Sequence, residues 1–150
     1  MSTADDWLAF ARLLLNGGEA NGRRLLRPAS VSRMTTNHLT TAQRDAGALF
    51  LEGQGWGYGG QVDVTPADPW NVPGRYGSVG GSGTAAHLVP STGTVTILLT
   101  QVAMEDPTPS PADAGFLALR GASLTTGAAV VTALRRAEGT RPGTGIGRER

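Results

Sequence analysis

The sequence predicts an α+β fold in which an antiparallel sheet of three to four strands is flanked by helices. Glycine is abundant, at 22 of 150 residues, and this suits short strands and tight turns better than a helical bundle. Residues 94–101 (TVTILLTQ) form the strongest strand pattern, because they are rich in β-branched residues. The candidate strands before this segment follow one another too closely for parallel crossovers, which favours an antiparallel meander.

The first element that we expect is an amphipathic helix. Ser2 or Thr3 can cap it, and Asp5 and Asp6 follow at the spacing of a capping box, with Asp in place of Glu. The segment Asn-Gly-Gly at 16–18 ends the helix, since glycine adopts the left-handed C-terminal conformation easily. Apolar residues recur at helical spacing and need another layer to cover them: Trp7, Phe10, Ala11, Leu14 and Leu15.

The next segments are shorter. Residues 19–27 predict a turn around Asn21-Gly22 followed by extended chain, and Pro28 suits the first turn of a short helix. Residues 35–53 are polar and mixed, so we expect a loop there.

Glycines alternate with larger residues over 55–62, which predicts a strand that another backbone approaches closely. The prolines of 65–74 predict a loop, and residues 75–79 and 83–89 predict two further strands. The prolines of 105–111 predict another loop.

The C-terminal third carries weaker signals. Residues 112–119 and 128–136 are helix candidates, whereas 138–150 (EGTRPGTGIGRER) is rich in Gly and Arg and is expected to be disordered.

The composition excludes several classes of function. The net charge of +1 gives no electrostatic reason to expect nucleic acid as a partner. The chain has no Cys and no Lys, and His38 and His87 are too few for a zinc site, so we expect no metal and no cofactor.

No apolar run approaches the ~20 residues of a membrane span. There is no signal peptide, which predicts a cytoplasmic protein if Met1 is the true start.

Four stretches resemble the C-terminal portion of the β-lactamase-related serine hydrolases, which include class C-like β-lactamases, penicillin-binding-protein-like peptidases and esterases. They are 2–18 (STADDWLAFARLLLNGG), 24–39 (RLLRPASVSRMTTNHL), 55–60 (GWGYGG) and 74–101. The resemblance implies a partial domain of this family over 1–120, with the helix candidate and disordered tail over 121–150.

This resemblance implies acyl-transfer chemistry on esters, β-lactams or peptidyl-D-alanine-like amides. The family uses a nucleophilic Ser in S-x-x-K, a second motif such as Tyr-x-Asn, and a third motif, K-T-G or a variant, on a strand. The third motif corresponds to Ser78-Val79-Gly80, and the Gly81 N–H to an oxyanion donor. Ser78 departs from the family, which has Lys, His or Trp there.

The first two motifs are absent from this sequence. Without Lys there is no S-x-x-K, and the nearest string, Ser30-Val31-Ser32-Arg33, ends in a residue that cannot act as a base. Tyr76-Gly77-Ser78 resembles Tyr-x-Asn only loosely, because it ends in Ser rather than Asn. We therefore expect the chain to be inactive alone, and a separately encoded N-terminal half that complements it is one alternative for its partner. In the family an N-terminal strand completes the sheet, so an unpaired sheet edge is also expected.

Other interpretations stay open. The chain can instead be a non-catalytic binding module that reuses this half-fold. Residues 80–83 (GGSG) predict a glycine-rich turn rather than a phosphate loop or a nucleophile elbow at Ser82, because Thr84 replaces the last Gly and His87 lies too near along a strand. His38 is expected on the surface or in packing. Three aromatic residues are expected in the sheet and core: Trp56, Tyr58 and Trp70.

Overall fold

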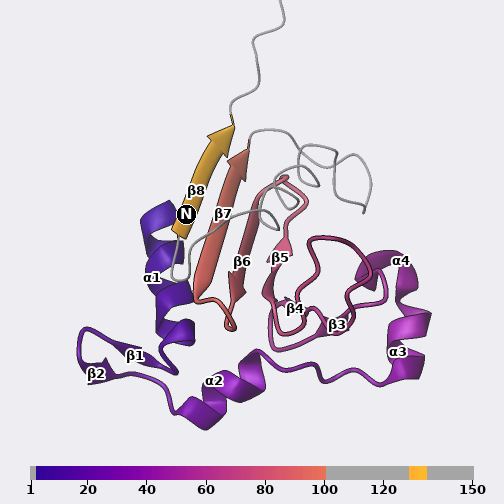
Figure 1. The fold of residues 1–150 in the computed structure, drawn as a ribbon, viewed down its shortest axis with the longest axis horizontal. Helices are drawn as coiled ribbons and strands as arrows, with labels where there is room; N and C mark the ends of the chain where they lie inside the picture. The colour runs from indigo at the N-terminus through magenta and orange to yellow at the C-terminus, as the bar shows by residue number, and fades with distance from the viewer. Residues whose placement is uncertain (1–2, 101–128, 135–150) are drawn as a thin grey trace, which may run out of the picture.

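The computed structural model describes residues 3–100 and 129–134, which form two sheets and four helices (Figure 1). The α+β class is therefore confirmed. The helices are α1 (Ala4–Leu15), α2 (Pro28–Met34), α3 (Thr41–Ala46) and α4 (Ala48–Leu51). The strands are β1 (Glu19–Ala20), β2 (Arg23–Arg24), β3 (Gly55–Trp56), β4 (Gln61–Val62), β5 (Tyr76–Val79), β6 (Ala85–Val89), β7 (Thr94–Thr100) and β8 (Ala129–Leu134).

The main sheet has six strands in the order β3-β4-β5-β6-β7-β8. Strands β3 to β7 form the antiparallel meander that the short connections predict. The sheet is larger than the three to four strands expected from the sequence. One reason is that residues 55–62 form two strands rather than one, since the chain turns back where the Gly57 N–H donates to the Gly60 carbonyl over 2.8 Å.

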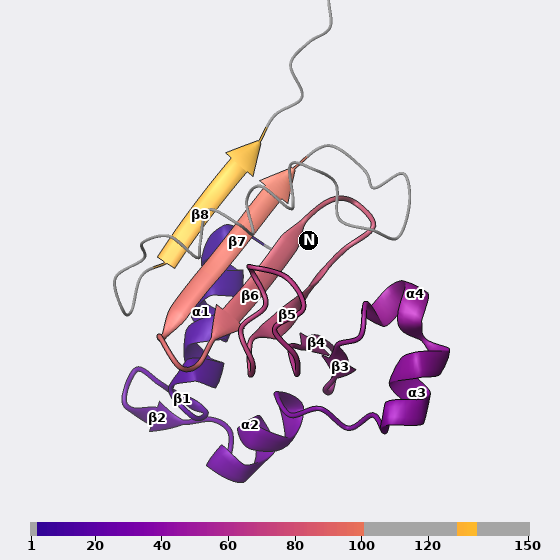
Figure 2. The ribbon, with the colours of Figure 1, turned by 45° about the vertical axis from the view of Figure 1, so that its right-hand side comes forward.

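Helix α1 has the N-terminus that the sequence predicts. The Asp6 N–H donates to the Thr3 hydroxyl over 3.1 Å, and the Thr3 N–H donates to the Asp6 carboxylate over 3.2 Å, which completes the capping box. The helix ends at Asn16, and Gly17 follows with a φ of +60°. It lies across one face of β6 and β7 (Figure 2).

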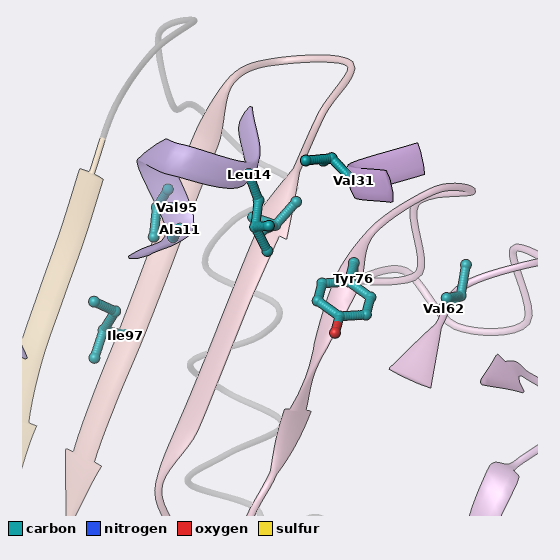
Figure 3. Packing of buried hydrophobic residues seen from close by; sticks show 8 residues of the cluster. Ala11, Leu14, Val31, Val62, Tyr76, Val95 and Ile97 are labelled. Atoms are coloured by element: carbon teal, nitrogen blue, oxygen red, sulfur yellow. The ribbon is translucent and has the colours of Figure 1, made fainter. Parts of the chain in front are cut away.

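The main core lies between α1 and this sheet face (Figure 3). Ile97 of β7 is only 1% exposed, and Leu88 of β6 is 4% exposed. Leu98, which is fully buried, belongs to a separate cluster with Ala85 because successive strand residues point to opposite faces. The main cluster comprises Ala11, Leu14, Val31, Val62, Tyr76, Leu88, Val95 and Ile97.

The turn between β1 and β2 follows the prediction for Asn21-Gly22. Both residues have positive φ, at 52° and 71°, as a two-residue hairpin turn of type I′ requires. Arg24 fixes the hairpin to the end of α1, because its guanidinium donates to the Gly17 carbonyl over 3.0 Å and to Glu19 over 3.1 Å.

The loop expected over 35–53 is wrong in part, because α3 and α4 lie within it, beyond β3 at the end of the sheet opposite β8 (Figure 1). Thr40 caps α3 in a capping box with Gln43. The Thr-x-x-Gln signal is present in the sequence and explains why a polar segment becomes helical.

The helix expected over 128–136 is also wrong. Residues 129–134 instead form β8, which pairs in parallel with β7 and brings Val131 opposite Ile97. The β-branched residues of AVVTAL suit a strand, and the ladder with β7 outweighs a weak helical pattern. Strand β8 lies beyond residue 120 yet belongs to the same sheet, where it pairs with β7 and forms the edge opposite β3. The candidate helix at 112–119 and the tail at 138–150 lie outside the described residues.

The glycines of 55–62 allow the close backbone approach that their spacing predicts. A Cβ on Gly60 would lie 2.9 Å from the Tyr76 ring, and one on Gly57 would collide with the Met34 carbonyl.

Within 3–100 and 129–134, no helix has the length and apolar character needed to cross a bilayer.

Candidate functional site

A hollow of about 570 Å³ opens between α1 and the face of β5, β6 and β7. Trp7 and Phe10 border it from α1, and their rings meet edge to face with centroids 5.7 Å apart. Ser78 of β5 also lines it. The described residues that line the hollow include no Asp, Glu, Lys or Arg, so this site suits an uncharged occupant.

The structure places Ser78 and Val79, which the resemblance assigns to the third motif together with Gly80, at the end of β5. Ser78 pairs with Ala86 and therefore shares the α1 side of the sheet, because Ala86 packs into the main core. Val79 is on the opposite face, with Ala85 and Leu98. Gly80 follows the strand, and both Ser78 and Gly80 line the hollow.

The turn after β5 is held by its own backbone. The Gly80 N–H donates to the Thr84 carbonyl over 2.8 Å, and the Gly83 N–H donates to the Gly80 carbonyl over 2.8 Å. This is the glycine-rich turn that the sequence predicts. The Gly81 N–H has no hydrogen-bond acceptor among the described residues, so it is available as a donor to a ligand.

The fold itself does not explain the glycines at 80 and 81. Neither has a positive φ, a Cβ on Gly80 would lie 3.4 Å from the Thr84 hydroxyl, and a Cβ on Gly81 would meet nothing within 4 Å. Gly77 differs, because a Cβ there would collide with the Ala86 carbonyl. No contact or backbone angle within the described residues requires glycine at 80 or 81. Such glycines are consistent with the close approach of a ligand or another segment.

The two serines near the turn bond to their neighbours. The Ser78 hydroxyl donates to the Val79 carbonyl over 3.3 Å, and the Ser82 hydroxyl lies 3.2 Å from that of Thr84. His87 pairs with Gly77 and lies on the alternate face from Ser78. The structure thus brings Ser78, Gly80 and Gly81 together but provides no serine–histidine geometry at Ser82.

His38 has a packing role in the described structure. Its ring stacks on Tyr58 with centroids 4.4 Å apart, and its Nε2 lies 2.7 Å from the Arg33 carbonyl. Because a carbonyl only accepts, that nitrogen must carry the proton and donate.

The three other aromatic residues expected in the sheet and core differ in exposure. Trp56 and Trp70 are half-buried, whereas Tyr58 is 58% exposed, so the core position expected for Tyr58 is wrong.

Tyr76 holds the site rather than supplying a base. Its hydroxyl donates to the Tyr58 carbonyl over 2.7 Å, and burial raises the pKa of the Tyr76 phenol. The phenol is therefore protonated at neutral pH. The string Tyr76-Gly77-Ser78, which loosely resembles Tyr-x-Asn, therefore has no proton acceptor at its tyrosine.

Sequence reasoning missed a buried ion pair beside the site. The guanidinium of Arg75 donates to Asp63 over 2.9 and 3.2 Å, and both side chains are nearly inaccessible. Asp63 also accepts from the Asn71 side chain and the Val72 N–H. The pair closes the loop that precedes β5 and so fixes where this strand begins. The two residues are separated by 12 positions along a proline-rich segment, and no local spacing rule identifies such a pair.

Two amide side chains with structural roles, the buried Gln54 and the half-buried Asn37, were missed as well. Gln54 is 1% exposed and accepts from the N–H groups of Val64 and Thr65. The Asn37 side chain accepts from the Trp56 N–H over 3.0 Å, which ends the sheet at β3. No group of three or more His, Cys, Asp or Glu side chains within the described ranges could hold a metal ion.

Comparison with known proteins gives two similar sequences from Mycobacterium tuberculosis. The chain is 39% identical over 108 residues to "Protein Rv1367c" of strain H37Rv and, to the same extent, to "Uncharacterized protein MT1414" of strain CDC 1551. Each match covers 67% of this chain but only 27% of the relative, so the chain corresponds to about a quarter of those proteins. No family model matches the chain.

Proposed function

We propose that this chain is the C-terminal portion of a β-lactamase-related serine hydrolase and supplies one wall of an acyl-transfer site. The observation that carries the proposal is the end of β5, where Ser78 and Gly80 border an uncharged hollow and the Gly81 N–H is available as a donor. The order of elements, with a helix packed on an antiparallel meander, supports the same assignment.

The proposed role of this wall is electrostatic. A tetrahedral intermediate of acyl transfer develops negative charge on the carbonyl oxygen, and a backbone N–H aimed at that oxygen stabilises it. Gly81 would be that donor, and glycines at 80 and 81 would let the substrate lie directly against the backbone. The nucleophile and its base would come from a segment that this sequence does not contain.

The chain alone is accordingly inactive in this proposal. It contains no Lys for an S-x-x-K motif, and the loss of a nucleophile costs about 10⁶ in kcat in a serine protease. Purified chain should hydrolyse nitrocefin and p-nitrophenyl esters no faster than buffer. Ser78→Ala and Ser82→Ala should leave this background unchanged, and turnover above background by the wild-type chain would contradict the proposed division of the site.

The family assignment itself is tested on a longer relative. Full-length Protein Rv1367c, of which the match covers 27%, should turn over one of these two substrate classes. If the full-length relative hydrolyses neither, the hydrolase proposal fails.

A non-catalytic binding module is the second candidate, and the uncharged hollow favours it. Such a module predicts a stable monomer with one cooperative thermal transition. A part of a larger enzyme predicts poor solubility or oligomers, because part of its core is open. Size-exclusion chromatography with a melting curve separates the two.

A further inference from the structure

The strands that carry the candidate site have no carboxylate, ammonium or guanidinium side chain. From Tyr76 to Thr100 the sequence contains no Asp, Glu, Lys or Arg. The one imidazole of this stretch, His87, is 6% exposed and lies on the alternate face of the sheet from Ser78. A ligand placed against Ser78 and Gly80 therefore meets hydroxyls and backbone groups of β5 and its turn, and no cation of these strands.

Two charged groups adjoin this wall, and neither attracts an anion. Arg75 directly precedes β5, but its guanidinium donates to Asp63 over 2.9 and 3.2 Å, and its side chain is 5% exposed. On the α1 side, Thr3 lines the hollow, and its N–H donates to the Asp6 carboxylate over 3.2 Å. A negative ligand would thus approach a neutralised cation on one side and an anion on the other.

A carboxylate is poorly accommodated by such a wall, whereas an uncharged polar group is not. An ionised carboxylate loses its hydration on binding, and a cation or several N–H groups must replace it. An ester or amide oxygen needs only one or two donors. The Gly81 N–H is available as one, and the Ser78 hydroxyl is a second, because its bond to the Val79 carbonyl is long, at 3.3 Å.

We propose that Ser78 is a specificity-determining residue, which selects neutral esters over substrates with a free carboxylate on the leaving-group side of the scissile bond. Penicillin-type β-lactams and peptidyl-D-alanine belong to the disfavoured class. The inference rests on the proposed function for the reaction, since the scissile carbonyl would lie at the Gly81 N–H. The charge preference is argued from Ser78 and the uncharged strands alone.

The test compares benzylpenicillin with its methyl ester as ligands of the purified chain. The two compounds differ only in the carboxylate, which the ester masks, and a chain without a nucleophile should leave both intact. A ligand-observed NMR titration should show at least about tenfold tighter binding of the methyl ester, because its carboxyl group needs no counter-ion. Equal affinities, tighter binding of the acid, or no measurable binding of either compound would overturn the proposal.

The variant Ser78→Lys tests whether the preference depends on this residue. A cation there should raise the affinity for benzylpenicillin about fivefold, the upper range for an exposed ion pair, and change that for the methyl ester less than about twofold. Ser78→Met should keep the preference for the ester, since it removes the hydroxyl without adding charge.

Ser91→Lys is the matched control, because it adds the same charge in the exposed turn at the other end of β6. It should leave both affinities unchanged, and equal gains from Ser78→Lys and Ser91→Lys would overturn the role of Ser78. Circular dichroism and a melting curve check folding. If Ser78→Lys does not fold, Gly80→Lys takes its place, since Gly80 is exposed and lines the same hollow.

Hydrolysis by the full-length relative is measured separately, so that the two proposals can fail separately. A preference of the chain for the methyl ester without hydrolysis by the relative leaves the neutral-ligand site in place and contradicts the hydrolase. Hydrolysis by the relative without a preference of the chain keeps the hydrolase and overturns the role of Ser78.

Discussion

The carboxylate of Asp63 is a buried charge that several groups hold in place. It accepts hydrogen bonds from Arg75, Asn71 and the Val72 N–H, and it is 2% exposed. Removing one partner of a buried pair leaves the other charge without compensation. We expect Asp63→Asn to lower the free energy of unfolding by about 3–5 kcal/mol in a denaturant titration.

Glu19→Gln is the matched control for that substitution. Glu19 forms an ion pair with Arg24 over 3.1 Å, and both side chains are about half exposed. An exposed pair of this kind contributes at most about 1 kcal/mol. Equal losses in Asp63→Asn and Glu19→Gln would show that the buried pair does not hold the loop before β5.

Glu52 provides a pH-dependent prediction. Partial burial, and to a smaller extent the charge of Asp68, raise the pKa of Glu52 above its ordinary 4.5. Because the folded-state pKa is the higher one, the ionised carboxylate lowers stability at neutral pH, and this loss disappears as the pH falls through the raised pKa. Glu52→Gln should therefore stabilise the fold at pH 7 but not at pH ~4.

Asp68→Asn should give a smaller gain at pH 7, since it removes only the repulsion and leaves the burial. Melting temperatures at the two pH values measure both effects. A gain from Glu52→Gln that is equal at both values would contradict this explanation.

At the scale of elements, two signals that depend only on residues close in sequence predicted the structure correctly. The box at Thr3 and Asp6 and the turn at Asn21-Gly22 appear as expected, because each depends on residues only a few positions apart. The box at Thr40 is equally local, yet the segment that contains it was expected to be a loop. Strand β8 is different, since its partner β7 ends 29 positions before it begins. No local pattern identifies such a pairing.

Alanine substitutions at Gly18 and Gly22 separate the cost of a positive φ from the cost of a steric collision. Gly18 and Gly22 both have positive φ, at 92° and 71°. A Cβ on Gly22 would meet nothing within 4 Å, whereas one on Gly18 would collide with the Leu26 carbonyl. Gly22→Ala should cost about 1–2 kcal/mol of stability from its backbone conformation alone.

Gly18→Ala should cost at least about 1 kcal/mol more, because the collision adds to the backbone term. Chemical denaturation of the two variants side by side is the measurement. Equal costs would mean that the contact between the end of α1 and Leu26 is not tightly packed.

At the scale of the whole molecule, the resemblance suggests a site at the end of β5 but says nothing of its surroundings. Ser78 and Gly80 both line the hollow, because they lie close together on β5 and the turn that follows it. The aromatic stripe of Trp7 and Phe10 was expected to be core-facing, and the hollow beside it depends on how α1 is placed on the sheet. That placement results from packing between segments more than 60 residues apart, which helical spacing does not encode.

The role of β8 gives a prediction for the intact sheet. A chain that ends at residue 128 lacks β8 and opens the edge of β7, whose seven residues TVTILLT carry no charge and no proline. Such an edge pairs readily with other chains. We expect light scattering and size-exclusion chromatography to show concentration-dependent oligomers for 1–128. The control is 1–134, which keeps β8 and should behave like the full chain, because both retain the ladder from Val95 to Thr100. If 1–128 is as monomeric and as thermally stable as 1–134, β8 does not protect this edge.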